Sequence, residues 1–306
     1  MSPARAQNQL LGPRSPFRVA LIGAGRVGGA IAEHLRRRGH EIVGVASRTP
    51  ESASRAARML GSRTFRPDDD PAPEADVLLV AVPDEAIGEQ VARLLPMVRA
   101  GVVVWHVSGS LALDPLTPAL ERGALACAVH PMQACPTIEA ALANLPGSAW
   151  GVTVSPGLEA WAHRLVSEDL SGVPVGLAAE HRGLWHAASV TTSTGVNAVM
   201  ALGEALLLEI GVTEPQRALG PLVAGTIDHS LSQGGARAAL TGPVVRGERG
   251  PLERHREALR SAADGSLLPD YLIVARLVLE RAVAAGKLDG GVAARMRDLL
   301  ADHRAP

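Results

Sequence analysis

A glycine-rich turn constrains this 306-residue chain more than any other stretch of its sequence. The turn reads Gly-Ala-Gly-Arg-Val-Gly; an apolar run at 17–22 precedes it, and a segment with helical spacing of apolar residues follows at 27–35. Strand, G-x-G-x-x-G and helix in this order is the arrangement that binds the pyrophosphate of a dinucleotide. The predicted strand before the turn and the predicted helix after it both match this arrangement, and a second apolar run follows at 41–46. We therefore favour dinucleotide binding over a purely structural turn.

Each glycine of the turn has its own predicted role. Gly23 permits the tight turn, Gly25 lets the backbone approach the pyrophosphate, and Gly28 lets the helix pack closely on the strand. The free N–H groups and the positive dipole end of the helix would hold the anion. The predicted contacts at the turn are Gly23, Ala24, Gly25, Arg26, Val27 and Gly28.

The residues after the second apolar run bear on which nucleotide binds. NAD-binding proteins of this kind usually have an acidic residue there, which bonds the ribose 2′-hydroxyl. This chain instead has Ser47, Arg48 and Thr49, which could bind a 2′-phosphate with arginine as the planar charged partner. We therefore favour NADP over NAD; the alternative is that Arg48 is only a surface residue.

Apolar runs alternate with helical segments through the first half of the chain. The expected strands are at 17–22, 41–46, 76–82, 102–107, 125–129, 150–154 and 173–177, and the expected helices at 27–35, 51–60, 86–95 and 158–165. Such alternation predicts an α/β fold with a doubly wound, mostly parallel sheet of the Rossmann type. We assign residues 16–177 to this domain and residues 1–15, which lack apolar periodicity, to a disordered tail.

Ligands of doubly wound sheets bind beyond the carboxyl ends of the strands. Val82 and Pro83, His106 and Ser108, and His130 occupy three such ends and are predicted to contact the cofactor. For His106 a contact with the nicotinamide ribose or the substrate and a structural bond to a loop carbonyl remain equally open, and His130 is similar.

From residue 178 to 306 the pattern is helical, with expected helices at 181–209, 214–232, 251–262, 269–285 and 291–301. On the first of these, polar residues share a sector under about 90° wide at 100° per residue. They are Arg182, His186, Ser189, Ser193, Asn197 and Glu204. Small hydroxyls, a histidine and an asparagine favour a substrate pocket; a solvated face or a helix-pairing seam is the alternative.

Roles within this stripe follow from side-chain chemistry. His186 is the candidate general acid because histidine titrates near neutral pH, although a structural imidazole is an equal alternative. His186 and Ser193 would polarise the carbonyl or imine, and Asn197, one turn further along the stripe, is a further catalytic candidate. Arg182, or Arg246 in the predicted loop at 241–248, could bind a substrate carboxylate; Arg246 could instead pair with Glu248 or cap a helix.

Composition narrows the class of protein. A net charge of −1 gives no basic field for nucleic acid or an anionic membrane. Cys127 and Cys135 fit neither a disulfide framework nor a zinc pattern, so we expect reduced thiols, no metal and a cytoplasmic location. The sequence has neither a secretory signal nor a long apolar span, so no membrane partner is expected.

The motifs together resemble a known family. The carrying stretches are 23–28, 82–84, 106–109, 130–133, 185–188 and 241–247. The chain is similar across residues 17–300 to Rossmann-like proteins whose C-terminal half is a domain of unknown function. These are related to pyrroline-5-carboxylate reductase and ketopantoate reductase within the 6-phosphogluconate dehydrogenase superfamily. The resemblance implies an NAD(P)-dependent oxidoreductase with a helical, dimer-forming second domain.

Two positions depart from the family pattern. Relatives commonly have lysine where this chain has Arg182, and Ser-Asn where it has Ser193-Thr194. Arginine stays protonated and is a poor proton donor. We therefore expect an NADPH-dependent reductase of a small carboxylated carbonyl or imine compound, acting as a homodimer. The alternative is an NADP-binding redox sensor or regulatory protein without catalysis.

Overall fold

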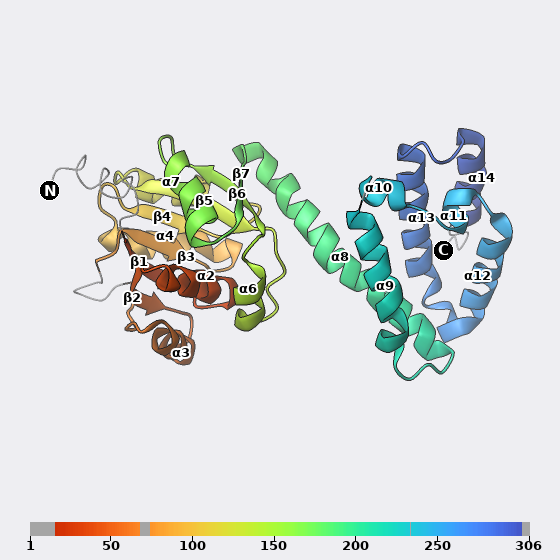
Figure 1. Ribbon diagram of the computed structural model, residues 1–306, viewed down its shortest axis with the longest axis horizontal. Helices are drawn as coiled ribbons and strands as arrows, with labels where there is room; N and C mark the ends of the chain where they lie inside the picture. Colours follow the sequence, from red (N-terminus) through yellow and green to blue (C-terminus); the bar gives the residue numbers. More distant parts are fainter. Residues whose placement is uncertain (1–15, 68–73, 233, 302–306) are drawn as a thin grey trace. The chain divides into compact units, whose positions relative to one another are not determined.

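The fold was analysed in a computed structural model that describes residues 16–67, 74–232 and 234–301 (Figure 1). The predicted tail at 1–15 lies outside these residues. The chain divides into two compact units, and the division falls between Ser193 and Thr194. The first unit holds the glycine turn, and the described residues of the second form helices and the turns between them.

The first unit is built on a seven-stranded sheet, as the alternating pattern predicts. Its order is β2-β1-β3-β4-β5-β6-β7; β6 is antiparallel to β5, and the other neighbouring pairs are parallel. The strands are β1 (Arg18–Ile22), β2 (Glu41–Ala46), β3 (Val77–Val80), β4 (Val103–His106), β5 (Leu125–Pro131), β6 (Ala149–Val154) and β7 (Val173–Gly176). This is the doubly wound, mostly parallel Rossmann architecture.

Two apolar cores lie on opposite faces of the sheet because successive side chains of a strand point to opposite sides. In β1, Val19 and Leu21 belong to one core, whereas Ala20 and Ile22 belong to the other. The first core also takes residues of α2 (Arg26–Arg37), α3 (Pro50–Leu60), α6 (Ile138–Asn144) and α7 (Glu159–Arg164). The second takes residues of α4 (Asp84–Leu94) and α5 (Thr117–Leu120). Both faces are therefore covered, which explains why the central strands read as unbroken apolar runs.

The second unit has its core among its last helices. Leu252, Leu272, Leu279 and Leu300 are fully buried there. The long helix α8 (Arg182–Glu209) enters this unit at Thr194, and α9 (Pro215–Leu231) follows it. The remaining helices are α10 (Gly235–Ala239), α11 (Pro243–Arg246), α12 (Arg249–Ser261), α13 (Leu268–Ala284) and α14 (Gly290–Leu300).

The predicted helices of the second half are present, but two short ones are not in the prediction. The stretch predicted as a loop at 241–248 contains the single-turn helix α11, and α10 precedes it. Gly242, with φ +107°, and Gly247, with φ +68°, bound α11 in conformations that glycine allows. The glycine and proline residues correctly predict where the chain turns. They do not predict the short helix α11 that lies between Gly242 and Gly247.

The division between the units falls inside α8 rather than near residue 178. The helix is continuous over 28 residues and passes through Gly195 without interruption. Its first turns belong to the Rossmann unit because Arg182 and Trp185 bond residues of the sheet. The strand-to-helix transition in the sequence is therefore not the boundary between compact units.

Two helices of the structure leave most of their apolar side chains uncovered. Arg182 is the one buried residue of α8, and Pro215 is the one buried residue of α9, among the residues described in each helix. Leu222 is 67% exposed and Leu231 82% exposed. Further exposed apolar residues on α8, α9 and α13 are Val190, Val199, Leu208, Ile227, Ile273 and Leu277. No described helix is long and apolar enough to cross a membrane.

Candidate functional site

The glycine turn lies between the end of β1 and the start of α2. Gly23 has φ +96°, and a Cβ there would lie 2.3 Å from the backbone oxygen of Ala81. A Cβ on Gly28 would lie 2.4 Å from the oxygen of Gly23 and 2.6 Å from the Cβ of Ala81. Both glycines are therefore required by the protein itself, as the strand–turn–helix pattern predicts.

Gly25 differs from the other two glycines. Its φ is −78°, and a Cβ built there meets no heavy atom within 4 Å. The described residues therefore leave room for a side chain at this position. A phosphate that approaches the backbone here would need that room, which explains the glycine. Gly25 also caps α2 without a side-chain hydrogen bond, and the first turn of α2 contains no acidic residue. The helix end is thus suited to an anion, and the turn fits a dinucleotide.

Neighbouring residues of the turn have different contacts. Ala24 is buried, whereas Arg26 is exposed and donates through Nη1 to the carbonyl oxygen of Pro136 at 3.3 Å. Val27 packs against the core on one face of the sheet. Arg26 is therefore the cation closest in sequence to the predicted phosphate site.

The three residues after β2 lie at the surface. Ser47 is partly exposed and Arg48 is exposed; no hydrogen bond or ion pair in the described part of the chain engages Arg48. Thr49 accepts a hydrogen bond from the backbone N–H of Ser52 at 3.3 Å and so caps α3. A capping hydroxyl can still donate its own proton, so the trio remains available to a phosphate.

The end of β3 and the loop after β4 are joined by a carboxylate. Ser108 and Ser110 each donate a hydroxyl hydrogen bond of 2.8 Å to Oδ2 of Asp84 at the start of α4. Ser108 Oγ also accepts from the backbone N–H groups of Ser110 and Leu111. This hydroxyl donates one hydrogen bond and accepts two, so no hydrogen bond remains for a cofactor. The predicted cofactor contact of Ser108 is therefore corrected: its side chain shapes the loop.

Two other predicted contacts lie beside this carboxylate in the sequence. Val82 is partly exposed, and its Cγ1 lies 3.0 Å from the position of a Cβ on Gly23, so it packs against the glycine turn. Pro83 is exposed and precedes the first turn of α4. Both stay candidates for cofactor contact.

His106 adopts the structural alternative. Its side chain is fully buried; Nδ1 accepts from the backbone N–H of Ser108, and Nε2 lies 2.7 Å from the carbonyl oxygen of Ala112, to which it donates. Burial lowers the pKa of His106 to about 4, so the imidazole is neutral at pH 7. Both nitrogens of His106 are bonded to the backbone, so the predicted contact with cofactor or substrate is corrected to a structural role.

His130, at the end of β5, keeps one nitrogen free. Nδ1 accepts a hydrogen bond from the indole N–H of Trp185 at 3.1 Å. Burial, followed by the charges of His186 and Arg182, lowers the pKa of His130 to about 4. Because an indole can only donate, Nδ1 must be unprotonated, and the neutral ring carries its proton on Nε2.

His186 lies next to His130 in the structure. The two ring centroids are 5.7 Å apart and the rings meet edge to face at 84°. A Cβ on Gly109 would lie 2.7 Å from Cδ2 of His186 and 2.9 Å from Nε2 of His130. His186 is partly exposed, and no hydrogen bond in the described chain engages either of its nitrogens. The fold thus brings together two of the predicted histidines, with Gly109 against both.

Arg182 does not have its predicted role. It is fully buried, and its guanidinium donates to the backbone oxygens of Ser108 and Ala128 and to the hydroxyl of Thr153. Burial lowers the pKa of Arg182 to about 10, which leaves it charged at pH 7. Among the residues that the structure describes, Nε of Arg182 is buried without a partner. Since two backbone carbonyls and one hydroxyl already accept from the guanidinium, a substrate carboxylate cannot take it, and the prediction is corrected.

The remaining stripe residues divide between the two units. Ser193 donates a hydrogen bond of 2.7 Å to the carbonyl of Ser189 within α8. Asn197 is exposed and belongs to the second unit. Arg182, His186, Ser189 and Ser193 thus lie on the part of α8 that belongs to the Rossmann unit, and the roles of Ser193 and Asn197 stay predictions.

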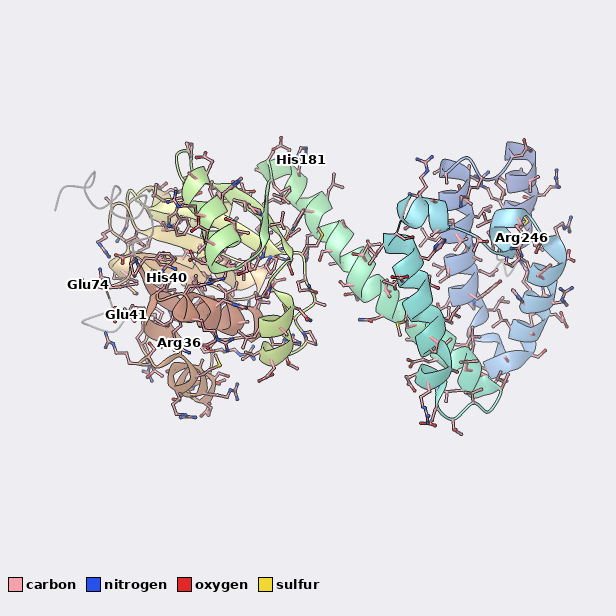
Figure 2. The ribbon with its side chains drawn as sticks, in the orientation of Figure 1. Arg36, His40, Glu41, Glu74, His181 and Arg246 are labelled. Carbon is pink, nitrogen blue, oxygen red and sulfur yellow. The ribbon has the colours of Figure 1, made fainter. Side chains whose placement is uncertain are left out.

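Arg246 takes the second of its two predicted arrangements. It ends α11 in the helical unit (Figure 2), and its Nε and Nη2 donate to the carboxylate of Glu248 at 2.7 and 3.1 Å. This bidentate pair occupies the fork that a substrate carboxylate would need. The proposed substrate contact of Arg246 is therefore corrected to an ion pair with Glu248.

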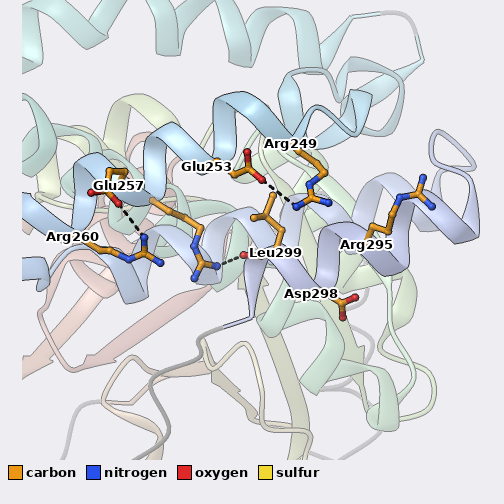
Figure 3. Close-up of a pocket in the computed structure, with 8 residues that line it drawn as sticks. Arg249, Glu253, Glu257, Arg260, Arg295, Asp298 and Leu299 are labelled. Atoms are coloured by element: carbon orange, nitrogen blue, oxygen red, sulfur yellow. Dashed lines mark hydrogen bonds and ion pairs between the residues drawn. The ribbon is translucent and has the colours of Figure 1, made fainter.

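A charged groove of about 510 Å³ lies between α12 and α14 (Figure 3). Arg249 pairs with Glu253, and Arg260 pairs with Glu257. Arg256 is buried and donates to the backbone oxygens of Leu299 and Ala301. Both ion pairs lie within α12, and Arg256 joins α12 to the end of α14, so the groove lies along a helix–helix contact.

Three residues of the site have no role in the sequence prediction. Gly109, Trp185 and Asp84 shape the surroundings of His130, His186 and Ser108. The signal for Gly109 is its place directly after a strand-end serine, and Asp84 begins a helix after a buried strand. Trp185 lies in a stretch that carries the family resemblance, but its role is not assigned, because an indole donor is recognised only when its acceptor from another element is known.

Two family matches cover most of the chain. Residues 3–131 match the family described as a Rossmann-like domain, and residues 148–276 match a domain of unknown function, DUF2520. No curated protein matches the sequence. The sequence resemblance to Rossmann-like proteins with such a C-terminal half is thereby confirmed.

Solved structures share the fold at low sequence identity. A Bacteroides fragilis protein provisionally named an NADP oxidoreductase has a TM-score of 0.71 and 23% identity, covering 89% of this chain and 99% of its own. An imine reductase from Pseudomonas sp. has a TM-score of 0.64 and 18% identity, covering 94% and 100%. A pyrroline-5-carboxylate reductase from Coxiella burnetii has a TM-score of 0.57 and 15% identity, covering 93% and 99%. The chain belongs to the Rossmann-like proteins that carry a DUF2520 domain.

Proposed function

We propose that this protein is a cytoplasmic, NADPH-dependent reductase of a small carboxylated carbonyl or imine compound. The observation that carries the proposal is a pair of features at one edge of the sheet. The glycine turn follows β1, and the free imidazole of His186 lies beside His130 at the end of β5, which is parallel to β1 through β3 and β4. Parallel strands end at the same edge, where doubly wound folds bind their ligands.

The names of the structural relatives support the same reaction class. They include an imine reductase, a pyrroline-5-carboxylate reductase and a reductive aminase from Aspergillus terreus in complex with NADPH. The names of these relatives indicate reduction at a C=N or C=O bond. A ketopantoate-like 2-oxo acid and a cyclic imine are accordingly the two substrate types to test.

The dinucleotide would be held by the backbone of the glycine turn and by the surface trio after β2. Gly25 and the first N–H groups of α2 would bind the pyrophosphate, and Ser47, Arg48 and Thr49 would bind the 2′-phosphate. Val82 and Pro83 lie at the adjacent strand end. When bound, the reduced nicotinamide supplies a hydride, and the protein supplies orientation and a proton.

The alternative, a redox sensor without catalysis, predicts no protonatable group at the strand ends. His186 has two unengaged ring nitrogens and partial exposure there, which favours the enzyme. The test is oxidation of NADPH, followed by absorbance, in the presence of a panel of 2-oxo acids and cyclic imines. Tight NADPH binding with no oxidation by any member of the panel would favour the sensor.

Arg48 is expected to make NADPH bind more tightly than NADH. Its exposed guanidinium has no partner in the described chain, and no carboxylate occupies the usual 2′-hydroxyl position. The Arg48→Ala variant should lose about 1–3 kcal/mol of NADPH binding, as for a charge-assisted hydrogen bond, and almost none of its NADH binding. Calorimetric titration of both cofactors measures this. Arg58→Ala removes another exposed arginine of the same unit and is the control; equal affinities for the two cofactors in wild type would contradict the assignment.

We further propose a homodimer formed through the helical unit. α8 and α9 bury almost no apolar residue among those described, although both are rich in Leu, Val and Ala. Exposed apolar side chains in such number are typical of a protein interface. A second copy of the chain supplies a matching apolar surface by symmetry.

The double variant Leu222→Glu/Leu231→Glu is expected to sediment as a monomer at micromolar concentration, where the wild type sediments as a dimer. Two charges placed among these exposed leucines would be costly to bury. Val173→Glu alters a 55%-exposed apolar residue of β7 and serves as the matched control. A monomeric wild type, or a double variant that remains dimeric, would contradict the proposed interface.

A further inference from the structure

We infer that the reductase proposed above acts on a carbonyl rather than an imine. Three groups meet at its strand ends: a neutral N–H donor on His130, the unengaged imidazole of His186, and the buried guanidinium of Arg182, which no carboxylate of the described chain contacts. This inference rests on the proposed function and narrows its substrate class. It follows from the contacts of His130, His186 and Arg182.

The donor is Nε2 of His130. The indole of Trp185 bonds Nδ1 at 3.1 Å, which requires Nδ1 to be unprotonated and leaves the proton of the neutral ring on Nε2. No hydrogen bond in the described chain engages Nε2, and the side chain is partly exposed. The absent side chain of Gly109 leaves this edge uncovered, since a Cβ there would lie 2.9 Å from Nε2. His130 therefore offers a hydrogen bond without offering a charge.

The proton source is His186. Of the three histidines at or beside the strand ends, His106 has both nitrogens bonded and His130 has one. His186 has neither bonded within the described chain, and it is partly exposed. Both nitrogens are therefore available to a substrate or to water, and the ring lies edge to face against that of His130.

The charge around the two imidazoles favours a developing anion. Arg182 is buried and charged, and its donors bind two backbone oxygens and a hydroxyl, with no carboxylate in hydrogen-bond contact. Asp84 is the acid whose charge reaches His130, but its effect there is smaller than that of Arg182. Oδ2 of Asp84 already accepts two serine hydroxyls. The charged group that contacts the backbone next to the two imidazoles is therefore the Arg182 guanidinium, through the oxygens of Ser108 and Ala128.

The two substrate classes place opposite demands on these groups. Reduction of a carbonyl forms a C–H bond at carbon from an external hydride, moves the π pair onto oxygen, and completes an O–H bond with the proton of His186, which then regains one from water. An imine is reduced after protonation at nitrogen, so it reacts as a cation that a neighbouring carboxylate would stabilise. A guanidinium and a neutral donor stabilise the oxyanion and repel the iminium.

The first test compares two five-carbon compounds that each carry a carboxylate next to the reducible carbon. These are 2-oxopentanoate and 1-pyrroline-2-carboxylate, each reduced with NADPH by the full-length wild-type protein. We expect kcat/KM to be at least about tenfold higher for the 2-oxo acid, the factor that corresponds to 1.4 kcal/mol. Equal or faster reduction of the imine overturns this inference and leaves the proposed function standing. If neither compound oxidises NADPH, both this inference and the proposed function are overturned.

The second test concerns the hydrogen-bond donor. His130→Phe removes Nε2–H and should lower kcat for 2-oxopentanoate by about 10²-fold, as loss of one oxyanion donor typically does. His130→Gln retains an N–H at a similar reach and should recover part of that loss. Equal activity of the two variants, at equal melting temperature, would overturn the role of the donor.

The third test reads the tautomer without any reaction. In Trp185→Phe the indole donor is gone, so the imidazole nitrogen resonances of His130 should change from a single Nε2–H tautomer to a mixture. His106 is fixed by contacts that do not involve Trp185, and its resonances are the internal control. A spectrum of His130 that does not change in Trp185→Phe would overturn the assignment of Nε2 as the fixed donor.

Discussion

Replacement of Gly25 by valine is expected to abolish dinucleotide binding by a protein that remains folded. A side chain at this position meets no heavy atom within 4 Å and requires no change of a φ that is already −78°. The valine would instead occupy the space through which a pyrophosphate approaches the backbone. We expect the affinity for NADPH to fall by at least about 10²-fold, or ~2.7 kcal/mol, in calorimetric titration, with little change in melting temperature.

The matched control is Gly28→Val, three residues further along the same turn. Here the new side chain would collide with the oxygen of Gly23 and the Cβ of Ala81, so the variant should lose stability as well as binding. Retention of native NADPH affinity by Gly25→Val would contradict the assignment of the turn to a dinucleotide. A large loss of stability in that variant would show that Gly25 has a structural role instead.

Removal of the imidazole of His186 is expected to lower kcat by roughly 10²–10⁴-fold, the usual contribution of a general acid. NADPH affinity should hardly change, because the glycine turn and the trio after β2 are built from other residues. The measurement is kcat for the best carbonyl substrate in His186→Ala, together with a calorimetric titration of NADPH.

His181→Ala is the control for this variant. His181 is exposed and precedes α8 directly (Figure 2), so its removal changes histidine content near the site without touching His130 or Gly109. A His186→Ala enzyme with native kcat would exclude His186 as the proton donor. It would leave the cofactor assignment intact.

Sequence reasoning predicts the order of strands and long helices because these elements are set by local patterns. Each central strand is an apolar run that lies between two cores. The α8 and α13 helices are long stretches rich in Ala, Leu and Val. Short elements are different. α11 has four residues, and its boundaries are set by two glycines with positive φ, so its sequence looks the same as that of a loop.

The site is predicted in part, and the errors share one cause. Motif spacing correctly indicates that Gly23 and Gly28 must be glycine, because the reason lies in the adjacent backbone. The roles of Arg182 and Arg246 are predicted wrongly because an arginine in a sequence gives no information about its acceptors. Arg182 finds backbone oxygens in the sheet, and Arg246 finds a carboxylate two residues away. The same limit applies to His106, whose acceptor is the carbonyl of Ala112.

The position of Arg182 on α8 determines how the gene could be cut or recombined. A fragment that ends at the last strand would lack the guanidinium that binds the oxygens of Ser108 and Ala128, and those buried acceptors would lose their donor. Each such loss costs about 1–3 kcal/mol. We therefore expect exchange of the helical half between relatives to require a crossover downstream of Arg182, inside a continuous helix.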